Sequence, residues 1–165
     1  MTIRQELEKE LEETRLRYLA LVDSIPESDY SLPTDNPDWN VGEMLFHITL
    51  GPPTLAFETW MITHVRGLFK FGIRVIPSSW MERLNGLYAQ RGGRITRLGL
   101  IKNYEAGHAR IMSRLRRTRD ADFSRVMEYP EDFLTMLTGT VTIERLFHYV
   151  KQHFEEHQAQ LGRSR

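Results

Sequence analysis

The chain contains no cysteine among its 165 residues. This absence excludes disulfide bonds, thiolate metal ligands and a cysteine nucleophile. If the protein handles thiols, they must arrive with a substrate or a cofactor. A chain of this length can bury a hydrophobic core without a disulfide or a metal, and it predicts a single domain over residues 1–165.

A net charge of either sign is also absent, because 22 basic residues balance 22 acidic residues. This balance argues against a nucleic-acid-binding protein that works through overall charge. Arg110–Arg119 is a local basic run, but such a run at the end of a helix more often interacts with the helix dipole and solvent. No apolar run approaches membrane-spanning length and no secretory signal begins the chain. We therefore expect no membrane association and a cytoplasmic location.

Strand signals are scarce, since no alternating run of β-branched residues exceeds a few positions. Helical periodicity is strong instead, and it predicts an all-α fold: a four-helix bundle with long connections and a short extra helix. The long helices are expected at residues 2–24, 40–69, 96–118 and from 142 onward, and the short helix at 79–90. Gly51-Pro52-Pro53 should kink or break the second long helix. We expect loops at 70–78 and little regular structure at 120–139.

The last predicted helix carries the most informative pattern. Its inward stripe consists of Ile143, Leu146, Val150, His153, His157 and Leu161. Two imidazoles therefore occupy positions where a bundle helix should present leucines. Residues four apart lie on one face of a helix, one turn above the other, so both rings can reach a single point. Neutral imidazole is a good ligand for zinc, nickel, copper or iron, and the pair supplies half of a coordination shell.

Two interpretations of this pair stay open from its spacing. Burying two imidazoles side by side is costly unless they are paired or bound to a metal, which would give both rings a partner. Alternatively, the last turns of the helix protrude and the pair is solvated. A metal would need a third ligand from the core. The candidate is His47, which lies one turn beyond Met44 on the inner face of the second helix. Taken alone, His47 fits a hydrogen-bonded core histidine better than it fits a metal ligand.

The remaining histidines are weaker candidates. His108 belongs to an E-x-x-H motif that begins at Glu105, but di-iron bundles use this motif twice and no second copy is present. His108 is instead the candidate fourth ligand that would close a purely structural site. His64 and His148 are expected at the surface or as support for the ligands. A zincin is a poor match, because an H-E-x-x-H motif needs glutamate where Phe154 stands.

Two segments together resemble the DinB-like superfamily of small metal-binding four-helix bundles. The first is Asp38–Ile48, where Trp39 precedes a helix and a short run follows that ends in His47. The second, about a hundred residues later, is Thr142–Leu161, which has a threonine start, the H-x-x-x-H pair and a glutamine followed by a hydrophobic residue at its end. The resemblance covers the whole chain in length and helix order. On the matching positions it implies a divalent metal, zinc or nickel, bound by His47, His153 and His157.

The resemblance also suggests an activity. Characterised members include thiol-dependent transferases and isomerases, in which the metal binds the sulfur of a low-molecular-weight thiol such as mycothiol and lowers its pKa. It therefore implies a metal-dependent thiol S-transferase or isomerase with a small-molecule substrate, and a homodimer, which the aromatic-rich stretch Phe57–Phe71 also favours. Three neutral histidines leave the metal an open position, which suits water activation and hydrolysis as well.

An alternative from a different class is a non-catalytic metal-binding bundle that acts as a sensor, a store or an interaction module. An enzyme would need a cavity with polar walls above the metal. The residues expected to line that cavity are Trp80, Tyr88, Arg91 and Arg94.

Overall fold

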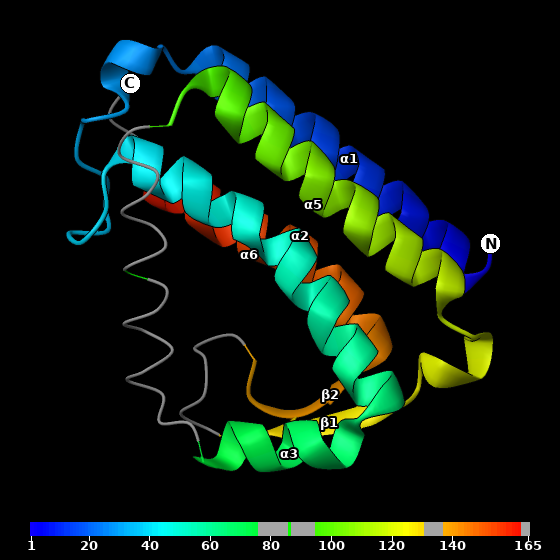
Figure 1. Ribbon diagram of the computed structural model, residues 1–165. Helices are drawn as coiled ribbons and strands as arrows, with labels where there is room; N and C mark the ends of the chain where they lie inside the picture. Colours follow the sequence, from blue (N-terminus) through cyan, green and yellow to red (C-terminus); the bar gives the residue numbers. More distant parts are fainter. Residues whose placement is uncertain (76–85, 87–94, 131–136, 163–165) are drawn as a thin grey trace.

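The computed structural model describes residues 1–75, 86, 95–130 and 137–162. Four long helices pack side by side (Figure 1): α1 (Ile3–Ser24), α2 (Val41–His64), α5 (Arg97–Arg117) and α6 (Ile143–Gln160). Helices α1 and α2 each pack against both α5 and α6. The predicted mainly helical bundle is therefore confirmed.

Side chains just before the long helices determine where the helices begin. The Asn40 side chain accepts a hydrogen bond from the Glu43 N–H at 2.9 Å, and the Glu43 carboxylate accepts one from the Asn40 N–H at 2.9 Å. This capping box satisfies two donors that the first turn of a helix leaves without partners. Thr142 caps α6 in a similar way, through the Arg145 N–H. The predicted starts of both histidine-bearing helices are thereby confirmed.

Helix α2 continues without interruption through Gly51-Pro52-Pro53, so of the predicted kink or break only the break is wrong. Proline removes backbone donors, and Figure 1 shows α2 bending about halfway along its length. Close packing explains why the helix persists. A Cβ atom on Gly107 of α5 would lie 2.8 Å from Cδ of Pro53, so only glycine allows α5 to approach the proline rings this closely.

The structure also differs from expectation beyond α2. Helix α2 ends at His64, and α3 (Arg66–Val75) extends into the segment 70–78, which was expected to be a loop. Two strands, β1 (Val126–Tyr129) and β2 (Gly139–Thr142), pair antiparallel in the segment expected to be irregular, with Val126 opposite Thr142. Strands of four residues are too short to show a periodic pattern. The helix expected at 79–90 lies outside the described residues except for Gly86.

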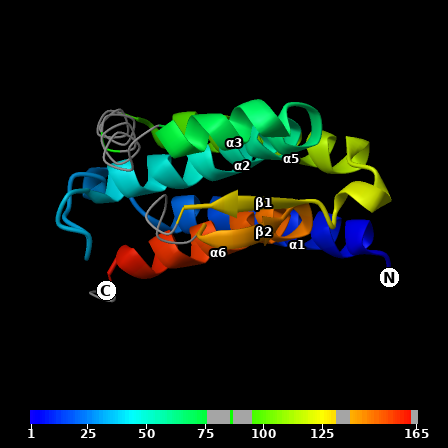
Figure 2. The ribbon, with the colours of Figure 1, turned by 90° about the horizontal axis from the view of Figure 1, so that it is seen from below.

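The strand pair lies between α3 and α6, which it contacts through β1 and β2 respectively (Figure 2). The described residues also include short 3-10 turns at Glu27–Asp29 and Asp120–Asp122. None of the described helices is long and apolar enough to cross a membrane.

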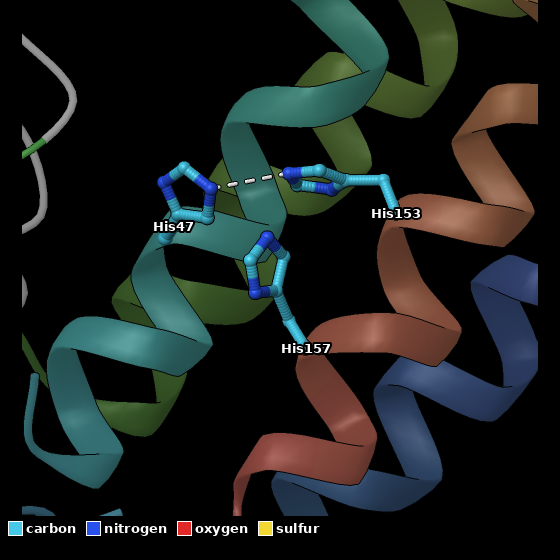
Figure 3. Close-up of side chains that lie close together, drawn as sticks. All are labelled: His47, His153 and His157. Atoms are coloured by element: carbon cyan, nitrogen blue, oxygen red, sulfur yellow. Dashed lines mark hydrogen bonds between the residues drawn. The ribbon is translucent and has the colours of Figure 1, made fainter. Parts of the chain in front are cut away.

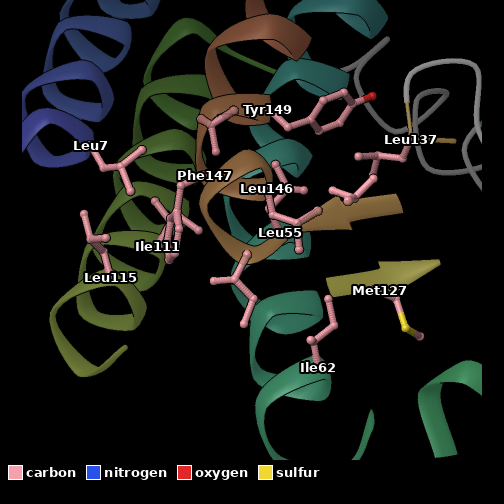
Figure 4. Packing of buried hydrophobic residues seen from close by; sticks show 14 of the residues in the cluster. Leu7, Leu55, Ile62, Ile111, Leu115, Met127, Leu137, Leu146, Phe147 and Tyr149 are labelled. Atoms are coloured by element: carbon pink, nitrogen blue, oxygen red, sulfur yellow. The ribbon is translucent and has the colours of Figure 1, made fainter. Parts of the chain in front are cut away.

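Two groups of buried apolar side chains hold the helices together. The larger group joins the strand pair to the adjoining halves of all four long helices (Figure 4). The smaller group lies at the other end of α1, where the Tyr18 and Tyr104 rings stack with centroids 4.1 Å apart. Both groups consist of apolar and aromatic residues, so the fold does not depend on a metal for its core.

Candidate metal centre

Three histidines converge between α2 and α6 (Figure 3). His47 extends from α2, and His153 and His157 extend from consecutive turns of α6. Their ring centroids lie 4.6–5.0 Å apart. One nitrogen from each ring lies within 4.8 Å of the other two. The rings therefore face one point, as the sequence predicted, whereas metal binding at that point stays a prediction.

The spacing of the His47 and His153 nitrogens fits a divalent metal ion. Nitrogens bound about 2.0–2.1 Å from a tetrahedral zinc ion are roughly 3.3 Å apart. Nε2 of His47 lies 3.2 Å from Nε2 of His153. No histidine, cysteine, aspartate or glutamate among the described residues adds a fourth ligand to this group. Catalytic zinc sites have three protein ligands, whereas structural zinc sites have four.

All three imidazoles are held in the neutral form that binds metals. Burial lowers the pKa of His47 to about 3, and the neighbouring His157 lowers it further. Burial, followed by His47 and then His157, holds the pKa of His153 well below its usual value. Burial also lowers the pKa of His157, against the opposing effects of Gln160 and Glu156. Neutral rings keep the lone pairs that a metal requires.

One buried atom of the site lacks a hydrogen-bond partner. Nδ1 of His47 has none among the described residues. Buried polar atoms in native proteins are nearly always paired, so a group left without a partner points to a function or to a bound species. Because Nε2 of His47 faces His153, the unpaired Nδ1 lies on the other side of the ring and does not itself mark the point where the three rings meet.

Neighbouring side chains orient the three rings. Oε1 of Gln160 lies 3.0 Å from Nδ1 of His157. When Nδ1–H donates a hydrogen bond to this oxygen, the lone pair of Nε2 is left free to face the site. The Trp39 ring covers His47 and His157, with centroid distances of 4.4 and 5.8 Å. The histidine pattern itself indicated neither contact. Trp39 and Gln160 do fall within the two segments that carry the family resemblance.

Gly51 provides the space for His153. A Cβ atom on Gly51 would lie 2.8 Å from Nδ1 of His153, closer than real side chains come. A helical glycine beside two prolines had suggested only a bend in α2. Its role at the site depends on how closely α2 and α6 approach each other, which no sequence pattern contains.

The other candidate residues lie apart from the three histidines. His108 lies 3.2 Å from the Glu12 carboxylate, so it is not the fourth ligand that a closed site would need. His148 pairs with Glu10 at 2.8 Å, and the His64 ring stacks on Trp60. The predicted cavity residues are Trp80, Tyr88, Arg91 and Arg94, and they lie outside the described part of the chain.

The two carboxylates between the α6 histidines differ in their surroundings. Glu155 pairs with Arg17 at 2.6 Å on the outside of the bundle. Glu156 has a buried oxygen, Oε2, with no hydrogen-bond partner among the described residues. Its charge also raises the pKa of both His157 and Tyr149. Glu156 is therefore the carboxylate beside the site.

Comparisons with known proteins identify the fold. No protein-family model matches the sequence, and no curated protein matches it. One similar solved structure is the crystal structure of the mycothiol-dependent maleylpyruvate isomerase, with a TM-score of 0.68 and 16% sequence identity. The chain has the fold of this isomerase. A histidine-to-alanine mutant of the isomerase gives a TM-score of 0.67 and 15% identity.

Both alignments cover 98% of this chain and 64% of the isomerase chain. The chain therefore spans just under two thirds of the isomerase. At this level of identity the likeness concerns the fold, and it confirms the architecture that the DinB-like resemblance predicted.

Proposed function

We propose that the chain is a metal-dependent enzyme of the thiol S-transferase or isomerase type. His47, His153 and His157 would bind a divalent metal, zinc or nickel, and a low-molecular-weight thiol would react with a small-molecule substrate there. The convergence of three neutral imidazoles carries the proposal. The shared fold with a mycothiol-dependent isomerase favours thiol chemistry. Because the chain has no cysteine, the thiol must come from a cofactor.

A divalent metal bound by the three imidazoles would act as a Lewis acid that lowers the pKa of a thiol. The protein's part is to prepare the ligands. Gln160 orients the His157 ring through Nδ1, and Gly51 leaves room for the His153 ring. Trp39 covers two of the rings and keeps water from that side of the site. These contacts hold the imidazoles in place before the ligand arrives, which reduces the cost of reorganisation.

Glu156 is our candidate for the group that takes the thiol proton. Its buried Oε2 has no hydrogen-bond partner among the described residues that would compete for a proton. Glu156→Gln should slow the thiol-dependent reaction while leaving metal content unchanged. The matched control is Glu155→Gln, on the same turn, whose carboxylate pairs with Arg17 outside the site. Equal activity of the two variants would remove Glu156 from the mechanism.

Metal analysis of the purified protein and of two variants tests the site. His153→Ala should lose the metal and remain helical with a cooperative thermal transition, because the apolar core is separate from the rings. His148→Ala is the matched control on the same helix, since His148 pairs with Glu10. It should keep the metal. Retention of a full equivalent of metal by His153→Ala would contradict the assignment of the ligands.

Cobalt substitution tests the thiol. Titration of the cobalt-loaded protein with low-molecular-weight thiols should produce a sulfur-to-cobalt charge-transfer band. Cobalt binding without any spectral response to thiols would contradict thiol chemistry and favour the hydrolytic or non-catalytic alternative. Because metal content and thiol response are measured separately, the two parts of the proposal can fail independently.

A homodimer also stays a prediction. The apolar side chains of Leu68 and Phe71 lie one turn apart on α3 and are 67% and 64% exposed. A second copy of the chain could cover them, so they are compatible with a dimer. Light scattering at micromolar concentration would test the dimer. A monomer at that concentration would contradict the dimer and leave the rest of the proposal unaffected. A cytoplasmic location is likewise still a prediction.

A further inference from the structure

A groove lies between the second half of α2 and the second half of α5, and it shares no residue with the histidine site. It is formed by two adjoining hollows of about 490 and 560 Å³. Both hollows are lined by Trp60, Arg114 and Arg117, so they form one continuous surface. Its volume lies in the range of small-molecule binding sites. We call this surface the arginine–aromatic groove.

Its α2 side is a series of nearly parallel aromatic rings. The Phe57 and Trp60 centroids lie 6.0 Å apart with ring planes at 23°, and the Trp60 and His64 centroids lie 5.4 Å apart at 20°. Phe57 is 56% exposed and Trp60 is 37% exposed. A bundle core would have buried these rings. Exposed flat faces of this kind are suited to stacking a planar aromatic ligand.

The α5 side of the groove carries three arginines that pair with no carboxylate of the described residues. Arg110, Arg114 and Arg117 line the groove from one face of the helix. Within the described ranges, no carboxylate pairs with any of the three. Arg116, outside the groove, does have such a partner, because it lies 3.6 Å from Glu8. Arg119 and Asp122 line one end of the groove and pair with each other at 2.9 Å, so that carboxylate already has its own arginine.

These arginines also repel one another. Burial lowers the pKa of Arg114, and the charge of Arg117 lowers it further. The C-terminal dipole of α5 favours cations in its last turn, which accounts for Arg114 and Arg117 in part. It does not account for Arg110, two turns from the end, or for the aromatic series opposite. An anion between the arginines would relieve the repulsion and form charge-assisted hydrogen bonds.

We propose that the arginine–aromatic groove binds a nucleoside phosphate, with the base stacked on Trp60 and Phe57 and the phosphates held by Arg114 and Arg117. The two walls require both parts of this ligand. A planar ring without charge would leave the arginines unpaired, and a phosphate without a ring would leave the aromatic faces exposed. From Arg110 to Arg117 the helix rises by about 10 Å, which is long enough to hold a chain of two or three phosphates.

Calorimetric titration of the full chain with adenosine diphosphate tests the proposal, with adenosine and inorganic phosphate as separate probes. The diphosphate should bind, quench tryptophan fluorescence and weaken with added salt, and each partial probe should bind at least tenfold more weakly. Arg114→Gln should weaken binding roughly tenfold, as expected for loss of a charged hydrogen bond. Trp60→Leu should weaken binding to a similar extent through lost stacking.

Arg116→Gln is the matched control, because it removes the same charge from the same helix outside the groove. It should leave the affinity unchanged. Absence of binding by the wild-type protein at millimolar nucleotide would overturn the proposal, and so would equal loss of affinity in Arg114→Gln and Arg116→Gln. Equal affinity for phosphate and for the diphosphate would remove the aromatic wall from the site. A dimer that Trp60→Leu dissociates, with no nucleotide binding, would assign the groove to a second copy of the chain.

Discussion

Replacing Glu58 by glutamine should stabilise the protein above neutral pH and remove much of the pH dependence of its stability. Glu58 lies on α2 and is only 8% exposed. Its Oε2 accepts a hydrogen bond of 2.9 Å from the Tyr129 hydroxyl on β1. Burial raises the pKa of Glu58 from 4.5 to about 7, although the Tyr129 hydrogen bond opposes the rise. The folded protein therefore holds this carboxyl protonated at a pH where an unfolded chain has released the proton.

The direction of this pH dependence follows from the higher pKa of Glu58 in the folded state. The stabilising contribution is fully present below the unfolded value of 4.5 and is lost as the pH rises through about 7. A rise of about 2.5 units corresponds to roughly 3 kcal/mol in the free energy of unfolding, most of it lost between about pH 5 and pH 8. Glutamine has nearly the same shape, can accept the Tyr129 hydrogen bond and does not ionise. It should therefore keep the stability that glutamate loses.

Urea unfolding of both proteins at several pH values, with a chelator present, measures the effect. The difference in unfolding free energy between Glu58→Gln and the wild type should grow by about 2.5 kcal/mol between roughly pH 5 and pH 8, as the other titrating groups cancel. Glu128→Gln is the control, because Glu128 is exposed on the same strand as Tyr129. A difference that stays constant over this range would refute the buried, protonated carboxyl.

Three further predictions concern the site and the packing around it. Gly51→Ala should displace the His153 ring and weaken metal binding at least tenfold in a competition titration, whereas Gly72→Ala on α3, with open space at its Cβ position, should not. Gly107→Ala should lower the unfolding free energy by roughly 1–3 kcal/mol, because its methyl group would meet the Pro53 ring. Gly72→Ala serves again as the control, and equal stability of the two variants would contradict the packing argument. In the Glu58→Gln protein, which lacks the opposing titration of Glu58, the metal-free form should lose stability as the pH falls below 6.5, by about 2 kcal/mol at roughly pH 5 from the lowered pKa of His47 alone, because the unfolded chain takes up the proton first. A urea midpoint of this variant that is unchanged between these pH values would refute it.

Local patterns predicted much of this structure. The capping box at Asn40 and the cap at Thr142 depend on residues at most three positions apart, so the sequence contains them directly. The H-x-x-x-H spacing likewise places two rings on one face of α6. Pairing these rings with His47, 106 positions away, followed from the inward-facing pattern of α2 and from the family resemblance.

The features that sequence did not predict depend on contacts between distant elements. Gly51 and Gly107 matter because of the side chains that face them, His153 and Pro53. The continuity of α2 through its prolines also reflects tertiary packing, which overrides the local loss of hydrogen bonds. The groove beside Trp60 combines residues from α2 and α5, and each helix alone had suggested only an aromatic stretch or a solvated basic run.

The direct junction between β2 and α6 has a consequence for the histidine site. Thr142 ends the strand and also caps the helix that begins at Ile143, so no residue separates the two elements. The pairing of Thr142 with Val126 therefore determines the rotational phase of α6. One residue inserted at this junction would turn the rest of the helix by about 100° and carry both of its imidazoles away from His47. The strand pair thus fixes the direction in which the α6 imidazoles point. Insertions or deletions between β1 and β2 should therefore preserve the histidine site only if Thr142 still pairs with Val126.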